Sequence, residues 1–492
     1  MGESDNKLWA QGAGDVDRKL CAQGAEEADR KLWAQGMKLL RVLAEAGHEA
    51  YLVGGCVRDR LIGRQLHDID IATSALPEQV QELFPRTLPT GLQHGTVTVM
   101  ADGAPFELTT YRTESGYSDS RRPDEVAFVR DVKEDLARRD FTFNAMAVGL
   151  DGELLDPFGG RDDLAAGIVR TVGRAEDRFG EDALRMVRAI RFGAELGFAL
   201  SADTWGGIAS RRERLANVAM ERIGAEWDKM MAGSGPDLAC AWLRHSGLLA
   251  YAKEAMPAVK GVGADELQEG EWAAKESGVV GSLRLADIQN VDARWAAFWI
   301  GVGATEADAL QACKTLRMSG KRGSRIAGIV GIERRLAGES VGAGTSGLAL
   351  IGGCDRGAWI EAVLDYGVPV AEDWLAIRDA VRGVAGANPK GGGQEDIRKH
   401  GGDKAAANGG GELPDERQWL AYMPIARIGE LAVRGDELSK LLDRPPGPWV
   451  AKLLRQLLSE VAHGRLANNA SELAEGAGRL AEEEGERVDP AK

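Results

Sequence analysis

Cysteine is scarce in this chain, and long apolar runs are missing. The 492 residues include five cysteines, with no Cys-x-x-Cys pair among Cys21, Cys56, Cys240, Cys313 and Cys354. An odd, scattered set argues against a disulfide framework or a zinc site and favours a reducing cytoplasm. No apolar run reaches the ~18–20 residues that span a bilayer, and the N-terminus is charged, so we expect neither a membrane segment nor a signal peptide.

The chain also lacks a positive net charge. Its formal net charge is −15, which argues against a uniformly basic RNA-coating protein. Binding to phosphate depends on local charge, however, and the arginines cluster between Arg112 and Arg214 whereas the C-terminal end is acidic. At a prior of ~150 residues per domain, a chain of this length predicts three or four domains.

One stretch, from Tyr51 to Thr73, combines a short apolar run, a Gly-Gly turn, a helical segment and a second strand that carries Asp68 and Asp70. Side chains alternate along a strand, so the two aspartates are expected on one face, with Ile69 on the other. Two neighbouring carboxylates repel each other. A divalent cation removes that repulsion, and Mg²⁺ prefers one or two carboxylates together with substrate phosphates.

The Gly-Gly turn adds a phosphate site to this stretch. Gly54 and Gly55 lie at the junction of strand and helix, where the missing Cβ lets a phosphate approach backbone N–H groups. Arg58 follows one turn later and can reach the same phosphates. Each half alone is a weak signal, but together they predict a nucleoside triphosphate held between Gly-Gly-x-x-Arg and a metal-bearing Asp-x-Asp.

The whole string resembles the class II nucleotidyltransferases, which comprise the tRNA CCA-adding enzymes and bacterial poly(A) polymerases of the polymerase-beta-like superfamily. Three later strings carry the same resemblance: Arg138–Met146, Asp156–Gly160 with Asp163, and a tail from Met423 to Val450 like that of the Bacillus-type CCA-adding enzymes. The resemblance implies an α+β head domain, with a small mixed sheet and helices, followed by an all-α neck, body and tail.

The predicted domain boundaries follow changes in composition. They are a repetitive N-terminal extension at 1–36, a nucleotidyltransferase head at 37–172, neck helices at 173–235, a helical body at 236–382, a Gly-rich linker or insert at 383–411, and a helical, tRNA-binding tail at 412–492. The extension holds three similar copies that begin at Lys7, Lys19 and Lys31. Only the third, which runs into an amphipathic helix, is expected to pack.

Two strands, Thr96–Met100 and Phe106–Tyr111, are expected after the aspartates. The second makes Glu107 a candidate third carboxylate beside the metal, although an ordinary glutamate at a strand edge explains it equally well. The polar stretch Ser115–Arg130, with Gly116 and Pro123, predicts a mobile loop.

The resemblance implies nucleotidyl transfer, in which an RNA 3′-hydroxyl attacks the α-phosphate of a triphosphate and pyrophosphate leaves. Two Mg²⁺ ions at Asp68 and Asp70 would serve this reaction. Backbone at Gly55, together with Arg58, would hold the triphosphate. By resemblance, Arg139 joins them. Asp140 and Asn144 would then lie near the sugar.

A continuous helix from Phe179 is predicted to carry base recognition. Leu184, Val187, Ile190 and Ala194 form its buried stripe, and a second strip steps by three through Asp182, Arg185, Arg188 and Arg191. The resemblance implies that Asp182 accepts from the amino group that cytosine and adenine share, while Arg185 donates to their ring nitrogen. Uracil and guanine present the reverse order. Arg188 and Arg191 would lie nearer phosphate and sugar.

Within the family, CCA addition, CC-only or A-only addition and poly(A) synthesis all fit this pattern. The favoured one is template-independent addition of CCA to the tRNA 3′ end from CTP and ATP. CC-only enzymes lack the loop that 115–130 provides, and poly(A) polymerases usually end in a basic segment, unlike the acidic end here. A non-catalytic tRNA-binding protein and an antibiotic nucleotidyltransferase are the rivals from other classes. No membrane partner is expected, and a homodimer is an assembly that the sequence leaves open.

Overall fold

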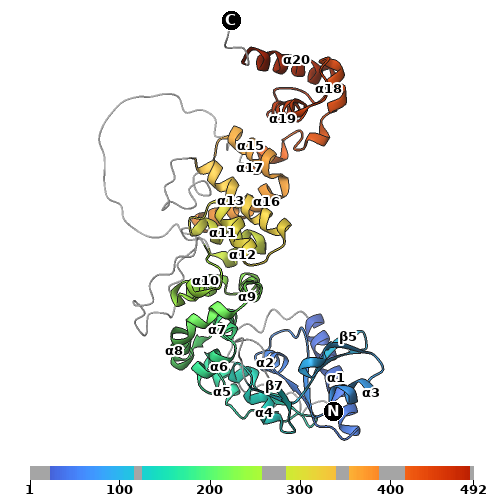
Figure 1. The fold of residues 1–492 in the computed structure, drawn as a ribbon, viewed down its shortest axis with the longest axis vertical. Helices are drawn as coiled ribbons and strands as arrows, with labels where there is room; N and C mark the ends of the chain where they lie inside the picture. Colours follow the sequence, from blue (N-terminus) through green and yellow to red (C-terminus); the bar gives the residue numbers. More distant parts are fainter. Residues whose placement is uncertain (1–22, 116–124, 257–283, 339–353, 387–415, 488–492) are drawn as a thin grey trace, which may run out of the picture. The chain divides into compact units, whose positions relative to one another are not determined.

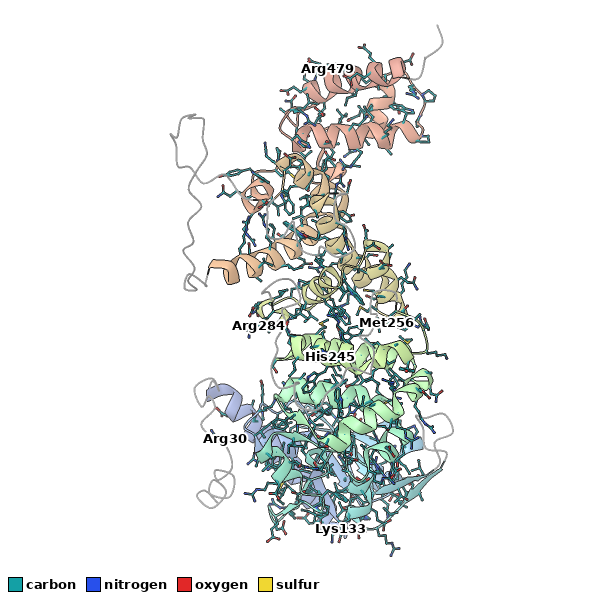
Figure 2. The ribbon with its side chains drawn as sticks, turned by 90° about the vertical axis from the view of Figure 1, so that its left-hand side faces the viewer. Arg30, Lys133, His245, Met256, Arg284 and Arg479 are labelled. Carbon is teal, nitrogen blue, oxygen red and sulfur yellow. The ribbon has the colours of Figure 1, made fainter. Side chains whose placement is uncertain are left out.

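The computed structural model describes residues 23–115, 125–256, 284–338, 354–386 and 416–487. The chain divides into two compact units, Met1–Lys275 and Glu276–Lys492, coloured blue to green and yellow to red in Figure 1. This division falls inside the range 236–382 that composition suggested as one body. The described chain stops there at Met256 and resumes at Arg284 (Figure 2). None of the helices in the described ranges is long and apolar enough to cross a membrane.

A mixed seven-stranded sheet forms the centre of the first unit, in the order β3-β4-β5-β2-β1-β8-β9. Strand β2 runs parallel to β5 and antiparallel to β1, which places it in the middle. The strands are β1 (Ala50–Val53), β2 (Asp70–Thr73), β3 (Thr87–Gly91), β4 (Thr96–Ala101), β5 (Ala104–Thr110), β8 (Ala147–Val148) and β9 (Leu154–Leu155). The strands expected around residues 51, 96 and 106 are therefore confirmed.

One face of this sheet is an apolar core. Residues in register across a sheet point to the same side, and Leu52, Ile71 and Leu108 form such a row of buried side chains. Helix α1 (Gln23–Glu45) packs on β1 and β2, and its Gly36 lies against the Leu52 side chain. Helix α3 (Pro77–Leu83) packs on β4 and β5 (Figure 1).

The opposite face of the sheet carries two acidic residues, Asp70 and Glu107. Val53, Asp70 and Glu107 are in register across β1, β2 and β5. Since neighbours in register share a face, the two carboxylates project on the side away from the Leu52 core. Val53 also joins a second apolar cluster, which includes Val132 and Leu136 of helix α4 (Val132–Ala137). The acids thus stand beside a packed region that fixes the strands.

The predicted mobile loop at 115–130 is partly wrong. An antiparallel pair of strands, β6 (Arg112–Ser115) and β7 (Glu125–Phe128), occupies its two ends. Alternation of Val126 and Phe128 is the strand signal that the turn-forming residues obscured. Residues 116–124 lie outside the described residues.

The string Asp156–Gly160 with Asp163 holds in place the turn formed by the string Arg138–Met146. The Asp156 carboxylate accepts the Gly160 N–H at 2.7 Å and so begins helix α5 (Gly160–Ala166). Asp163 accepts the Thr142 hydroxyl at 2.6 Å, which ties α5 to the short 3-10 helix η2 (Thr142–Asn144). A Cβ on Gly160 would lie 2.3 Å from the Thr142 carbonyl oxygen, so glycine is required for this contact.

The long helix predicted from Phe179 is interrupted. Helix α6 (Ala175–Glu181) ends before Asp182, which has an extended backbone (φ −132, ψ 105), and helix α7 (Leu184–Leu196) begins just after it. The predicted buried stripe of α7 is confirmed, because Leu184, Val187, Ile190 and Ala194 are all buried. The remaining elements of this unit are α2 (Gly55–Leu61), η1 (Leu92–His94), β10 (Ile168–Val169), β11 (Ala199–Leu200), α8 (Ala202–Arg211), η3 (Arg212–Asn217), α9 (Met220–Ala232), α10 (Pro236–Ser246) and η4 (Leu248–Tyr251).

Helices alone make up the described part of the second unit. Its helices are η6 (Leu285–Asp287), α11 (Val291–Gly301), α12 (Glu306–Thr315), α13 (Gly320–Ala337), α15 (Arg356–Tyr366), α16 (Val368–Gly386), α17 (Glu416–Ala421), η7 (Ile428–Glu430), α18 (Gly435–Leu441), α19 (Pro448–Ala462) and α20 (Ala470–Arg487). Fully buried tryptophans, among them Trp295 and Trp359, fill its core. Helix α16 continues to Gly386, and the rest of the Gly-rich range 383–411 lies outside the described residues.

The third N-terminal copy packs as part of α1. Its Trp33 ring lies over the Arg60 guanidinium of α2, 4.2 Å from the ring centroid. Helix α1 begins at Gln23, so the boundary at residue 36 suggested by composition falls inside one continuous helix. The first copy lies outside the described residues.

Candidate active site

Asp70 and Glu107 are brought together by the register of β2 with β5, where they are direct neighbours. Asp68 differs from its predicted place, because β2 begins at Asp70 and Asp68 precedes it. The pairing of β1 with β2 ends at Val53 and Asp70, because the chain turns at Gly54. Asp68 therefore has no paired residue on β1. Asp68 and Glu107 are exposed, and Asp70 is half-buried.

The acidic cluster has the electrostatics of a cation site. Burial and the negative charge of Asp68 raise the pKa of Asp70 to about 6, with Arg139 opposing the rise and Glu107 adding to it. A bound cation would relieve this crowding of like charges. Within the described ranges, no three His, Cys, Asp or Glu side chains are placed to hold an ion by themselves. An oxygen-only pair completed by phosphates or water is the ligand set that suits Mg²⁺.

Gly54 is the tightest point of the site. Its backbone has φ 76 and ψ −130, which only glycine adopts easily. A Cβ at this position would lie 2.8 Å from Arg139 Nη1, 3.8 Å from Asp70 Oδ2 and 3.9 Å from the Asn144 carbonyl oxygen. Residues of β2, η2 and the segment after α4 therefore converge on this turn. Gly55, the predicted phosphate contact, opens α2 and is less crowded.

Arg58 is buried and points into the same region. Its Nη1 donates to Asn144 Oδ1 at 2.8 Å, and its Nε and Nη2 form a fork on Asp59 at 2.9 and 2.8 Å. Its guanidinium also lies over the Phe192 ring, 5.0 Å from the centroid. These contacts connect α2 to η2 and α7.

Arg139 is the arginine with the most unused hydrogen-bonding capacity here. Its two described bonds, from Nη1 to the Asn144 carbonyl and from Nη2 to Asp135, are both long at 3.4 Å. Its Nε is buried and has no hydrogen-bond partner. A cation beside the acids with donors to spare is suited to an anionic ligand such as phosphate.

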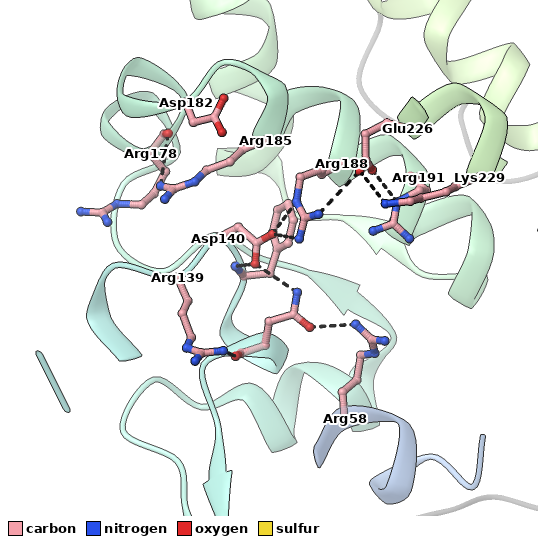
Figure 3. Close-up of polar contacts among 12 residues, drawn as sticks. Arg58, Arg139, Asp140, Arg178, Asp182, Arg185, Arg188, Arg191, Glu226 and Lys229 are labelled. Carbon is pink, nitrogen blue, oxygen red and sulfur yellow. Dashed lines mark hydrogen bonds and ion pairs between the residues drawn. The ribbon is translucent and has the colours of Figure 1, made fainter. Parts of the chain in front are cut away.

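Asp140 is the centre of a buried polar chain, shown in Figure 3. Its Oδ1 accepts from the Asn144 amide at 3.0 Å, and its Oδ2 accepts from Arg188 Nε and Nη2 at 2.8 and 2.6 Å. Burial alone would raise the pKa of Asp140, but Arg188, the Asn144 amide and Arg185 hold it well below its usual value. Asp140 is therefore an ionised acceptor that fixes both η2 and α7.

The predicted reading pair lies at the start of α7. Asp182 Oδ1 accepts the Leu184 N–H at 3.0 Å and so caps the helix. Arg185 Nη1 donates to Glu181 at 2.7 Å, and its Nη2 donates to the Arg138 carbonyl at 2.9 Å. The charge of Arg185 acts on Asp140, so the pair borders the polar chain rather than facing away from it.

Arg191 differs from the other arginines of the predicted strip. It is buried, and its Nε and Nη1 donate to Glu226 of α9 and to Glu195, both at 2.7 Å. Glu226 also lies 3.7 Å from Arg188 Nη1. Arg185, Arg188 and Arg191 would repel one another, and each is paired with an acidic side chain of the protein itself. Sequence reasoning missed Glu226 and Arg222, because their partners Arg191 and Asp182 lie 35 and 40 residues away in the chain.

Comparison with family models matches three segments of the chain. Residues 50–170 match the poly A polymerase head domain. Residues 197–258 match the probable RNA and SrmB-binding site of polymerase A, and residues 415–477 match the putative tRNA nucleotidyltransferase domain 2.

Curated relatives and solved structures give a consistent result. The CCA-adding enzyme of Geobacillus stearothermophilus is 35% identical over 87% of this chain and 93% of its own length. That of Lactiplantibacillus plantarum is 51% identical over a shorter stretch, 45% of this chain and 53% of that enzyme. The crystal structure of the Bacillus stearothermophilus CCA-adding enzyme in complex with CTP superimposes with a TM-score of 0.70 at 31% identity, covering 92% of this chain and 99% of that one. The chain therefore belongs to the CCA-adding enzymes, a family of nucleotidyltransferases.

Proposed function

We propose that this chain adds and repairs the 3′-terminal CCA of tRNA from CTP and ATP without a nucleic-acid template. The observation that carries the proposal is the convergence on Gly54, where Asp70, Arg139 and the η2 turn come within 4 Å of one point. One bound nucleotide would then meet Asp70 as a metal ligand, Arg139 at its phosphates and the polar side chains near η2 at its sugar. The tail at 412–492 is proposed to bind tRNA.

We propose Mg²⁺ as the cation, held by Asp68 and Asp70 with Glu107 beside them. Bound there, Mg²⁺ would lower the pKa of the RNA 3′-hydroxyl and neutralise charge on the departing pyrophosphate. The protein supplies the rest of the site. Arg139, with its unpartnered Nε, is proposed to bind the triphosphate together with Arg58 and backbone at Gly55.

The sugar and base are proposed to meet the α7 side of the site. Asp140 and Asn144 are proposed to lie near the sugar, held to each other by the hydrogen bond from the Asn144 amide to Asp140. Asp182 would accept from the exocyclic amino group of cytosine or adenine, and Arg185 would donate to the adjacent ring nitrogen. Arg188 acts through Asp140, which it holds, and Arg191 supports α7 through Glu226.

The test is incubation of tRNA that lacks its CCA end with each labelled triphosphate and Mg²⁺, followed by sequencing of the product termini. CCA ends made from CTP and ATP alone support the proposal. Runs of adenosine would indicate a poly(A) polymerase, CC ends a partial activity, and unextended tRNA a non-catalytic binding protein.

Arg185→Ala is expected to blur the choice of C and A over U by about tenfold or more, because the ring nitrogen loses its charged donor. The measurement is competition between labelled CTP and UTP on the same tRNA. Arg174→Met, which removes an exposed arginine paired with Glu176, is the control and should keep the wild-type preference. An unchanged preference in Arg185→Ala would refute base selection by this residue.

The activity should fall on the acid side with a midpoint that depends on Mg²⁺. Metal-free Asp70 has its pKa raised to about 6, so protons compete with the cation for this carboxylate below that pH. Raising Mg²⁺ tenfold should move the acid midpoint downward, by up to about one pH unit. Initial rates from pH 5 to 8 at two Mg²⁺ concentrations measure the shift, and a midpoint independent of Mg²⁺ would contradict a metal at Asp70.

We also propose a cytoplasmic location, where tRNA is available and the described cysteines, all free thiols, stay reduced. Light scattering of the purified chain would distinguish a monomer of 52.6 kDa from a homodimer.

A further inference from the structure

Arg222 makes a two-pronged contact with Asp182 across 40 residues of sequence. Its Nη2 donates to Asp182 Oδ2 at 2.8 Å, and its Nη1 donates to Oδ1 at 3.3 Å. Arg222 lies in the first turn of α9, whereas Asp182 lies between α6 and α7. Both side chains are shielded, with 23% and 16% of their surfaces exposed, so the pair is stronger than a fully exposed one.

The carboxylate of Asp182 is thereby fixed in plane. Oδ1 is occupied by the Leu184 N–H, and the guanidinium fork prevents rotation about the last side-chain bond. Each carboxylate oxygen has two acceptor positions, so Oδ2 can still receive one N–H from a ligand. Asp182 is therefore fixed by Leu184 and Arg222 and keeps one acceptor position on Oδ2 free.

Arg185 is held in the same manner. Its Nη1 donates to Glu181 at 2.7 Å and to the Arg178 carbonyl at 3.5 Å, and one N–H of Nη2 goes to the Arg138 carbonyl. The second N–H of Nη2 is left for a ligand. Two groups that each hold one free position, and cannot turn, form a rigid acceptor–donor pair.

We infer that Arg222 is a positioning residue for nucleotide selection, acting on the base through Asp182 without touching it. The inference rests on the proposed role of Asp182 and Arg185. Discrimination between cytosine and uracil depends on an acceptor facing an amino group rather than a carbonyl. Sites of this kind need their groups held to within about 10–20°. A carboxylate free to rotate could accept from the N–H of uracil instead.

The experiment is competition between labelled CTP and UTP, with separate kcat and KM values for each, on tRNA lacking its CCA end. Arg222→Met keeps the length and apolar stem of the side chain but removes the fork. We expect its CTP-over-UTP preference to fall by at least about tenfold, mainly through a higher KM for CTP and a lower KM for UTP. Arg222→Lys retains the charge without the fork and should recover part of the preference.

The same competition separates the inference from its premise. If Arg185→Ala relaxes the preference and Arg222→Met does not, the positioning role of Arg222 is wrong while base reading stands. If neither variant relaxes it, base reading by this pair fails. An equal loss of kcat/KM for both triphosphates in Arg222→Met and Arg222→Lys would mean that Arg222 only stabilises the fold, and would overturn the inference. Arg174→Met is the control for loss of an arginine.

Discussion

Asp70→Ala should reduce nucleotide incorporation by at least about 100-fold while leaving tRNA binding unchanged. The Asp70 carboxylate lies against the Gly54 turn, with its Oδ2 3.8 Å from the position of a Cβ there. Its removal takes away the acid around which Asp68, Glu107 and Arg139 are arranged. Single-turnover incorporation and a filter-binding measurement with the same tRNA test both halves of the expectation.

The matched control is Asp162→Ala, which removes an exposed aspartate of α5 on the same unit. It should keep wild-type incorporation. Turnover of Asp70→Ala above about a hundredth of wild type, at saturating Mg²⁺, would count against metal catalysis at this position. Loss of tRNA binding in parallel would indicate a folding defect, and circular dichroism of both variants detects it.

Asp140→Ala should lower the free energy of unfolding by about 3 kcal/mol at pH 7, because it leaves the partly buried cation of Arg188 with only the longer 3.7 Å contact to Glu226. The Asn144 amide loses its acceptor as well, which loosens η2. Urea denaturation of the full chain measures the change. Asp162→Ala is again the control, and a loss below about 1 kcal/mol would show that Arg188 finds another partner.

The pH dependence of this contribution has a definite sign. The folded-state pKa of Asp140 lies well below its usual value, so the carboxylate stabilises the fold above the unfolded pKa of ~3.9. The contribution is lost as the pH falls from there through the folded-state pKa. The difference in stability between wild type and Asp140→Ala should therefore be constant near neutral pH and shrink in acid.

Local patterns in the sequence were sufficient for the framework of the head. The apolar run before Gly54 and the alternation around Ile71 each depend on neighbours in sequence. Both strands form, although the second begins at Asp70 and leaves Asp68 outside it. Glu107 was a candidate through its strand face alone, and the register with Asp70 then made it a neighbour. These features follow from the spacing of apolar residues and from the residues that form turns.

Other features depend on contacts between distant residues, which the spacing of apolar residues does not predict. The apolar spacing runs unbroken through Asp182, so the break between α6 and α7 could be anticipated only from the preference of aspartate for helix starts. Contacts of Asp182 with Arg222 and of Arg191 with Glu226 join residues 40 and 35 apart. Such pairs can be recognised only once the fold brings α7 and α9 together.

The most direct test of a shared metal and base-reading site is a crystal structure of the chain with CTP and Mn²⁺ in place of Mg²⁺. We predict an anomalous peak between Asp68 and Asp70, and the cytosine amino group within hydrogen-bonding distance of Asp182 in the same molecule. Manganese bound away from these acids, or a base turned away from α7, would contradict the account.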